Sequence, residues 1–418
     1  MNLFEYYRRL SPGTFPRETE QSMSEPKLYY FDNNATTRVA PEVVAAMLPY
    51  LTEFWGNPSS SYQFGHQLAK HIEAAREKVA ALINAEPKEI IFTSCGTESN
   101  NAAIHSALAT HPAKRHVITT SVEHSANIKF ADYLRKQHYE VTLLPVESDG
   151  SLDIHLLEKS IRPDTAIVSV MWANNETGVA FPLEEISAIC QSKAVPFHTD
   201  AVQVPGKLKM DVKDLGVDFL SMSAHKLHAP KGIGALYIKH HTRYQPYVIG
   251  GGQERGRRGG TESVADIVGF GRAAELALAN LPDEQTRVKQ LRDRMEQGIL
   301  KTVSDSVRNG DRDSRLPNTS NLSFGGVVAG DILKALDHVG ICASSGSACT
   351  TGSLEPSHVL TAMGFSAARA QGSIRLSLGI YNTAADVDYL LEQLPPIIAK
   401  LRTHAPAGKT APGRSVAA

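Results

Sequence analysis

The lysine at position 226 follows an apolar stretch and precedes a turn, which favours chemistry by its amine. Residues 219–222, FLSM, predict the end of a buried strand, and Pro230 and Gly232 predict a turn after Lys226. An ammonium group in apolar surroundings is desolvated, which lowers its pKa and leaves the amine free to form a Schiff base. From this stretch alone, an ordinary exposed loop lysine is the alternative.

Other predicted strand ends carry polar residues that suit a planar, phosphorylated ligand. Gly96 and Thr97 stand where a strand becomes a helix, a place that suits a phosphate, although Thr97 could equally be an ordinary helix cap. His124 precedes another helix and could stack on a ring, transfer protons near neutral pH or be a structural histidine. Asn175 could donate to a ring oxygen or a carboxylate, yet asparagine close to Gly178 is also typical of a turn.

Asp200 gives the most informative signal, because it closes an apolar strand and Gln203 follows at the start of a turn. A carboxylate buried there needs a cationic partner, since an isolated buried charge is costly or becomes protonated. A protonated pyridine nitrogen meets that need, and a charged pyridinium is the electron sink of pyridoxal phosphate chemistry. With such a cofactor, Lys226 also has a function.

The elements that must position these residues form an alternating pattern of strands and helices. Such alternation is typical of an α/β protein with a mostly parallel sheet flanked by helices, whose ligands bind beyond the carboxyl ends of the strands. Seven strands are expected, at residues 89–93, 116–120, 140–145, 166–171, 195–199, 218–222 and 234–239. Helices are expected at residues 41–51, 64–83, 99–109, 126–137 and 183–192.

The alternation stops after residue 239, where a loop rich in glycine and arginine at 250–261 leads into two long helices, at 262–279 and 284–303. Strands near 319–324 and 373–378 and helices near 331–338 and 384–402 predict a smaller α+β domain. We therefore expect a large domain over 36–283 and a small domain formed by 28–35 and 284–405. Residues 1–27 are expected to be a flexible extension, and 406–418 a disordered tail.

Composition narrows the classes of function. Lysine and arginine total 43 against 44 aspartate and glutamate, so no overall field favours nucleic acid or an anionic membrane as a partner. No apolar run approaches the roughly 20 residues of a spanning helix. The opening residues lack an apolar signal core, so a cytoplasmic location is expected. The four cysteines are irregularly spaced, which argues against a disulfide framework and a structural zinc site.

Taken in order, these clusters resemble those of the NifS/IscS-type cysteine desulfurases. These are fold-type I pyridoxal phosphate enzymes of the class V aminotransferase superfamily, with an aspartate aminotransferase-like fold. The resemblance runs from Tyr29 to Leu401 and rests on FDNNATT, FTSCGTESNN, SVEHSAN, NNETG, HTDAVQ, SAHKLHAPKG, GGQERGRRGGTES, SSGSACTTGSLEPSHVL and SIRLSLG. It implies conversion of L-cysteine to L-alanine, with the sulfur passed to a cysteine persulfide for iron-sulfur cluster assembly or thiolation.

The resemblance also implies how pyridoxal 5'-phosphate is held. Lys226 would carry the cofactor, Asp200 and Gln203 would face its ring nitrogen and phenolic oxygen, and His124, counted with the catalytic residues, would stack on the ring. The phosphate contacts would be Gly96, Thr97, Ser223 and His225, and Asn175 would also contact the cofactor. Thr261 would reach the phosphate of the neighbouring subunit, which implies a homodimer.

Substrate binding and sulfur transfer follow from the same resemblance. Arg375 would pair with the substrate carboxylate, a bidentate contact that lysine makes poorly, with help from Asn34 and Asn175. Cys349 matches the persulfide-forming cysteine, and its small neighbours in ASSGSACTTGS predict a mobile, exposed loop. The thiolate of Cys349 would attack the substrate sulfur while Lys226 moves the α-proton. No resident metal is expected, although Cys349 could transiently ligate a cluster on a partner.

Three other readings remain at this point. A selenocysteine lyase or an aminotransferase of the same fold would not need Cys349, and a non-catalytic scaffold would only bind sulfur-transfer partners. The sulfur acceptor, an iron-sulfur scaffold or another protein, does not follow from the sequence. TTGSLEPSHVL is closer to the nitrogen-fixation branch only by analogy.

Overall fold

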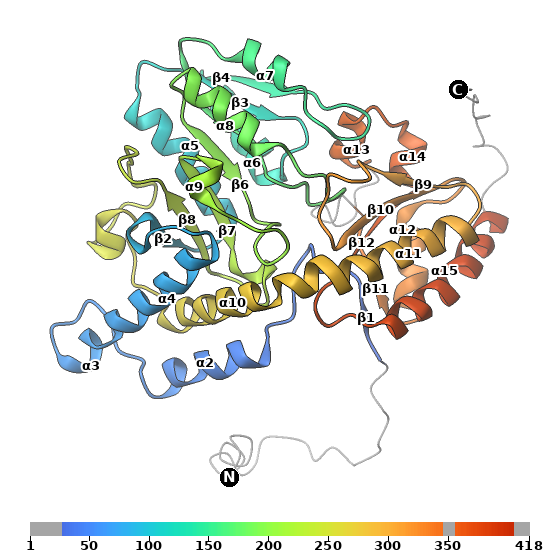
Figure 1. The fold of residues 1–418 in the computed structure, drawn as a ribbon, viewed down its shortest axis with the longest axis horizontal. Helices are drawn as coiled ribbons and strands as arrows, with labels where there is room; N and C mark the ends of the chain where they lie inside the picture. The colour runs from blue at the N-terminus through green and yellow to red at the C-terminus, as the bar shows by residue number, and fades with distance from the viewer. Residues whose placement is uncertain (1–26, 346–355, 405–418) are drawn as a thin grey trace, which may run out of the picture.

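The computed structural model describes residues 27–345 and 356–404. The centre of the fold is a seven-stranded sheet of strand order β2-β8-β7-β6-β5-β3-β4, flanked by helices (Figure 1). The strands are β2 (Ile90–Thr93), β3 (His116–Thr120), β4 (Glu140–Leu144), β5 (Thr165–Ser169), β6 (Phe197–Asp200), β7 (Phe219–Ser223) and β8 (Gly234–Ile238). The predicted mostly parallel seven-stranded α/β sheet is therefore confirmed.

One strand is antiparallel to its neighbours, but the carboxyl ends of the other strands still lie at one edge of the sheet. β8 runs antiparallel to both β2 and β7, whereas the other neighbouring strands are parallel. β2 therefore points in the same direction as β3 to β7. Its carboxyl end lies at the same edge of the sheet as theirs, which is the edge where parallel α/β sheets bind ligands.

Both faces of this sheet are covered. Along β2, Ile90 and Phe92 belong to one apolar cluster and Ile91 belongs to another, because successive side chains of a strand point to opposite faces. Burial on both faces explains why these strands are continuous apolar runs. The helices of this unit are α2 (Pro41–Thr52), α3 (Gln63–His66), α4 (Leu68–Leu82), α5 (Gly96–Thr110), α6 (Ser125–Lys136), α7 (Ile154–Ser160), α8 (Leu183–Ser192), α9 (Val212–Leu215) and α10 (Val264–Asp283), of which α2 packs on α10 and α3 on α4.

The last third of the chain forms a second unit with its own core. An antiparallel sheet of order β12-β10-β9 is built from β9 (Ser306–Asn309), β10 (Thr319–Phe324) and β12 (Ser373–Ser377). Helices α11 (Lys289–Thr302), α12 (Ala329–Asp337) and α15 (Ala384–His404) pack in this core, whereas α13 (His358–Ala362) and α14 (Ala367–Gln371) bury side chains such as Leu360 and Ala370 in an apolar cluster of the large sheet. This unit matches the predicted α+β domain, although the boundaries given above stay a prediction.

The first described residues belong to this second unit. Strand β1 (Tyr29–Tyr30) pairs in parallel with β11 (Ile341–Cys342), and Phe31 is fully buried in the second core. The chain then crosses to the large sheet, so residues 32–37 lie at the junction of the two units. The predicted extension, apart from Lys27, and the predicted tail lie outside the described residues.

A continuous helical segment links the two units, and it contains both of the long helices expected at 262–279 and 284–303. α10 passes through a π-helical turn, η4 (Glu284–Val288), directly into α11, and Figure 1 shows this helix running from the large sheet to the second unit. Pro282 lies within the helix and cannot donate a backbone hydrogen bond, yet the residue after α10, Glu284, keeps helical backbone angles. The π-turn follows directly, so the helix changes its local pitch here and does not end.

None of the helices in residues 27–345 and 356–404 is long and apolar enough to cross a membrane. Within the same residues, no group of three or more histidine, cysteine, aspartate or glutamate side chains could hold a metal ion.

Candidate active site

A cavity of about 370 Å³ lies beyond the carboxyl ends of the strands and brings together most of the predicted site residues. It is lined by Asn34, Gly96, Thr97, His124, Asn175, Asp200, Gln203, Ser223, His225, Lys226 and Arg375, among others. We call it the site cavity. Thr261 is exposed and does not line it, and Cys349 lies outside the described residues.

Lys226 reaches the cavity from the short turn that follows β7. Its Nζ donates to the carbonyl oxygens of Asn34 at 2.5 Å and Ala35 at 2.8 Å. Burial, and after it the cations Arg375 and Lys207, lower the pKa of Lys226 to about 7, against the opposing effect of Asp32 and Asp200. The sequence-based expectation of a desolvated amine is therefore matched by the structure, and near neutral pH much of this amine is uncharged and nucleophilic.

Asp200 ends β6 with its carboxylate held in place. Oδ2 accepts a hydrogen bond from Asn100 Nδ2 at 2.6 Å, and Oδ1 accepts one from the backbone N–H of Val202 at 3.0 Å. Asp200 is only 5% exposed, so a cationic group placed in the cavity would meet a preorganised, poorly hydrated anion. Asn100 was not anticipated from the sequence. The sequence feature that could have identified it is its position four residues after Gly96, which is one helical turn along α5.

His124 caps helix α6 and lines the same cavity. Its Nδ1 accepts a hydrogen bond from the backbone N–H of Ala126 at 3.2 Å, which leaves the ring proton on Nε2. Burial lowers the pKa of His124, while the carboxylate of Asp200 opposes that change. Directly behind it, Glu123 is fully buried and accepts hydrogen bonds from Thr120, Asn127 and the backbone of Met171. The histidine is thus a neutral ring fixed by its own helix.

The start of helix α5 forms the part of the cavity that suits an anion. The first backbone N–H groups of a helix lack intrahelical partners and carry partial positive charge. Gly96 opens this helix where space is short, because a Cβ there would lie 2.6 Å from Val202 Cγ2. Ser223 and His225 line the same cavity, and His225 Nδ1 lies 3.1 Å from Thr36 Oγ1. Burial lowers the pKa of His225 to about 4, so its ring is neutral.

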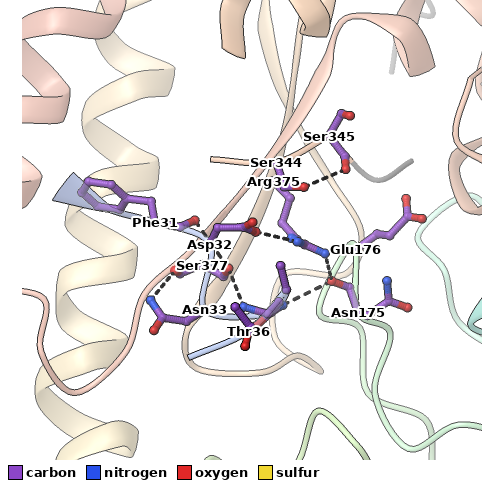
Figure 2. A network of polar contacts seen from close by, with 12 residues as sticks. Phe31, Asp32, Asn33, Thr36, Asn175, Glu176, Ser344, Ser345, Arg375 and Ser377 are labelled. Carbon is purple, nitrogen blue, oxygen red and sulfur yellow. Dashed lines mark hydrogen bonds and ion pairs between the residues drawn. The ribbon is translucent and has the colours of Figure 1, made fainter. Parts of the chain in front are cut away.

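Arg375 extends from β12 into the junction of the two units (Figure 2). Its guanidinium donates to the carbonyl oxygen of Asn175 at 2.9 Å and to Asp32 Oδ1 at 2.6 Å. Asn34 is also engaged, since its Nδ2 donates to Thr319 Oγ1 at 2.8 Å and its Oδ1 accepts from Asn318. Asp32 was missed by sequence reasoning, although it stands in the FDNNATT motif.

Several polar atoms of the cavity residues have no partner within the part of the chain that the structure describes. They are Gln203 Oε1, Asn175 Oδ1, Asn100 Oδ1 and Arg375 Nε. Buried polar atoms without hydrogen bonds are costly, so their gathering at one cavity indicates a polar ligand. An anion site, a buried carboxylate, a neutral imidazole and a weakly basic lysine together fit a phosphorylated pyridine aldehyde.

The described residues on both sides of Cys349 are attached to this site. Ser344 forms a backbone bridge with Arg375, and Ser357 Oγ donates to the buried Glu176 Oε2 at 2.5 Å. His358 Nε2 lies 2.9 Å from the carbonyl oxygen of Glu123. Figure 2 shows Ser344, Ser345 and Glu176 grouped around Arg375. Sequence reasoning did not find Glu176, which stands beside Asn175 in NNETG.

Comparisons with known proteins agree with this geometry. Residues 29–390 match the family Aminotransferase class-V. The chain is 54% identical to cysteine desulfurase 2 of Trichormus variabilis over 377 residues, which are 90% of this chain and 94% of that protein. It is 50% identical to cysteine desulfurase NifS of Azotobacter vinelandii over 378 residues, again 90% and 94% of the two chains.

A solved structure described as a NifS-like protein has the same fold. It aligns with a TM-score of 0.85 and 39% identity, over 90% of this chain and 100% of that one. The resemblance inferred from the ordered motifs is therefore confirmed. The chain belongs to the aminotransferase class-V family of pyridoxal phosphate-dependent enzymes, as a member of its NifS-type cysteine desulfurases.

Proposed function

We propose that this protein binds pyridoxal 5'-phosphate in the site cavity and converts L-cysteine to L-alanine, leaving the sulfur as a persulfide on Cys349. The observation that carries the proposal is the position of Lys226. Its weakly basic amine lines one cavity with the buried carboxylate of Asp200 and the guanidinium of Arg375. A reacting amine, a cation-binding carboxylate and a carboxylate-binding cation are the groups that this chemistry requires.

Each part of the cavity has a place in holding the cofactor. Lys226 would bond its aldehyde carbon, Asp200 would keep its ring nitrogen protonated, and Gln203 would donate to its phenolic oxygen. His124 would lie against its ring, and Asn175 would contact it. The residues for its phosphate would be Gly96, Thr97, Ser223 and His225. When bound, the cofactor supplies an electron sink for the α-carbon of the substrate.

The chain's own residues would then carry the reaction. Arg375 and Asn175 would bind the substrate carboxylate. The side-chain hydrogen bonds of Asn34 would hold its own backbone carbonyl in place, which is the group that Lys226 contacts. Lys226 would remove the α-proton. The Cys349 thiolate would attack the substrate sulfur, and the carbon–sulfur bond would break with its electron pair left on the β-carbon. That carbon takes up a proton to become the methyl group of alanine, and a proton returns to the α-carbon before alanine leaves.

A homodimer is part of the proposal. Thr261 is exposed on the single chain and follows the arginine-rich loop, where Arg258 is paired with Glu98 in the first turn of α5. In a dimer, Thr261 would reach the phosphate end of the neighbouring subunit's cavity. The sulfur acceptor, the cytoplasmic location and the domain boundaries remain predictions from the sequence.

The decisive experiment compares Cys349→Ala with Cys342→Ala. Alanine and sulfide released from L-cysteine are measured for both variants and for the unchanged protein. We expect Cys349→Ala to lose alanine formation and Cys342→Ala to keep it, because Cys342 lies in β11 and does not line the site cavity. Full turnover by Cys349→Ala would favour a selenocysteine lyase or an aminotransferase, and no turnover by the unchanged protein would favour a scaffold.

A further inference from the structure

A second cavity lies next to the site cavity, and Lys226 is common to the linings of both. It has a volume of about 290 Å³ and is bounded by the turn after β6 and by the junction of α10 with η4. Its lining includes Lys207 from the turn and Glu284 from the helix, and Glu42, Asp283 and His228 also line it. Lys226 therefore lies between the cavity proposed for the ligand and the cavity that Lys207 and Glu284 line.

Lys207 and Glu284 are both almost fully enclosed, at 4% and 5% exposure. Burial lowers the pKa of Lys207 and raises the pKa of Glu284, and each opposite charge pulls its partner back toward the ionised form. Glu284 Oε2 has no hydrogen-bond partner in the described residues, so the positive charge across the cavity is its main compensation. Burying two charged side chains costs free energy, which makes this pair a candidate for a functional role.

Hydrogen bonds connect Lys207 to Lys226 through one short turn. Lys207 Nζ donates to the carbonyl oxygen of Gln203 at 3.0 Å, and Gln203 Nε2 donates to the carbonyl oxygen of Asn34 at 3.0 Å. Lys226 Nζ donates to the same Asn34 oxygen. The ammonium of Lys207 thus fixes the residue that shares a hydrogen-bond acceptor with the reacting amine.

Glu284 occupies a special point of the long linking helix. It is the first residue of the π-turn η4, and π-turns inside α-helices are rare and frequent at functional sites. The next charged neighbours, Asp283 and Arg287, pair with each other, and Asp283, which also lines the cavity, is far more exposed than Glu284. The pitch change therefore coincides with the more buried of the two acidic side chains that this stretch contributes to the cavity.

We propose that Lys207 is a positioning residue for the reaction, whose ammonium, balanced by Glu284, holds the Gln203 turn and keeps Lys226 a neutral amine. The inference rests on the proposed function, in which Lys226 is the reacting group. Arg375 also repels a proton from Lys226, but the substrate carboxylate would neutralise it. Lys207 does not line the site cavity, so its surroundings would stay the same when substrate is bound.

The charges around Lys226 agree with this assignment. After burial, Arg375 and Lys207 are the causes that lower the pKa of Lys226, while Asp32 and Asp200 raise it. His124 and His225 also face Lys226, and burial lowers the pKa of each, so both are neutral. Lys207 is thus the buried cation near this amine that lies outside the site cavity.

The test measures the protonation of Lys226 directly. The full chain, freed of cofactor, is treated with acetic anhydride over a range of pH, and acetylation of Lys226 is quantified by peptide mass spectrometry. The variants are Lys207→Met, Lys207→Arg and the double variant Lys207→Met with Glu284→Gln. The single change leaves Glu284 buried without its cation and could unfold the chain, whereas the double variant removes both charges.

We expect the acetylation midpoint of Lys226 to move to higher pH by about half a pH unit or more in the double variant and in any folded Lys207→Met chain. Lys207→Arg, which keeps the charge, should stay close to the unchanged protein. In the cofactor-loaded protein, the pH midpoint of the visible absorption band should move in the same direction. A double variant with the Tm of the unchanged protein and an unmoved Lys226 midpoint would show that the pair is merely structural. Because acetylation needs no turnover, this result is independent of whether the protein desulfurates cysteine.

Discussion

Ser344 and Arg375 exchange two backbone hydrogen bonds: Ser344 N–H donates to Arg375 at 3.2 Å, and Arg375 N–H donates to Ser344 at 2.6 Å. The strand that supplies the proposed carboxylate-binding guanidinium therefore also fixes the chain just before the segment that contains Cys349. Substrate binding and sulfur acceptance would share one support, which suits a reaction in which a protein thiol must meet the substrate sulfur.

Replacing Arg375 by lysine should mainly weaken substrate binding. Lysine cannot contact Asp32, Asn175 and a carboxylate with one planar group. A lost hydrogen bond to a charged group costs roughly 1.5–3 kcal/mol, so kcat/KM for L-cysteine should fall by about tenfold to hundredfold. Arg369→Lys is the matched control, because Arg369 contacts Asn309 and lies outside the site cavity. An equal effect of the two changes would contradict the assigned role.

Asn100→Ala should weaken cofactor binding without removing a group that reacts. The change takes away the donor to Asp200 Oδ2 and leaves that buried oxygen short of a hydrogen bond, at a cost of about 1–3 kcal/mol. The dissociation constant for pyridoxal phosphate, followed by visible absorbance, should rise by about tenfold. Asn101→Ala, one residue along the same helix, serves as the comparison. Unchanged affinity in Asn100→Ala would mean that Asp200 needs no such support.

Capture of the cofactor by the empty protein should depend on pH through Lys226. Its pKa of about 7 lies far below the ordinary lysine value of 10.5, so the reactive neutral amine is the minor form below pH 7 and the major form above it. The rate at which the visible band appears should therefore rise between about pH 6 and 8 and then level off. A rate that kept rising tenfold per pH unit up to pH 10 would indicate an ordinary exposed lysine.

Local sequence features were enough to single out several of the residues that line the site cavity. Lys226, Asp200 and His124 each stand at or just after the end of an apolar strand, so their meeting at one sheet edge follows from the alternating pattern alone. Asp32 could not be found this way, because its partner Arg375 is 343 residues further along the chain. Its ion pair depends on β1 joining the second unit, and although residues 28–35 were expected in the small domain, that assignment does not say which side chains meet there.

The long linking helix is a second feature that local sequence patterns predict only in part. The sequence predicts two helices, at 262–279 and 284–303, and the structure has both, joined by a π-turn that begins at Glu284. Local helix propensity around Pro282 and its polar neighbours does not predict that the two helices join. The helix continues because apolar side chains on either side, such as Phe270 and Met295, are fully buried in different cores.

Gly96→Ala should disturb the phosphate end of the cavity through overpacking. The added methyl group would lie 2.6 Å from Val202 Cγ2, in the turn that holds Asp200, and such overpacking costs about 1–3 kcal/mol. We expect a lower Tm and weaker cofactor binding, with partial recovery in the double variant Gly96→Ala with Val202→Ala. Gly330→Ala is the control, since a Cβ there meets nothing within 4 Å. Without recovery in the double variant, the steric explanation would be wrong.

Ser357→Ala tests whether the described chain after Cys349 must be anchored for sulfur transfer. Ser357 caps helix α13 and donates to Glu176, a carboxyl group that is 2% exposed and whose pKa is raised by burial. Losing this donor should lower the free energy of unfolding by about 1–3 kcal/mol.

If the anchor also positions the thiol, persulfide formation on Cys349 in a single turnover with L-cysteine should slow more than the stability loss explains. Ser366→Ala removes the equivalent cap of the next helix, α14, which does not contact Glu176, and provides the baseline. Equal single-turnover rates for the two variants, despite a lower stability of Ser357→Ala, would limit Ser357 to a structural role. A slower rate only in Ser357→Ala would tie the buried carboxyl group of Glu176 to delivery of the sulfur, because that carboxyl is the contact that Ser366 lacks.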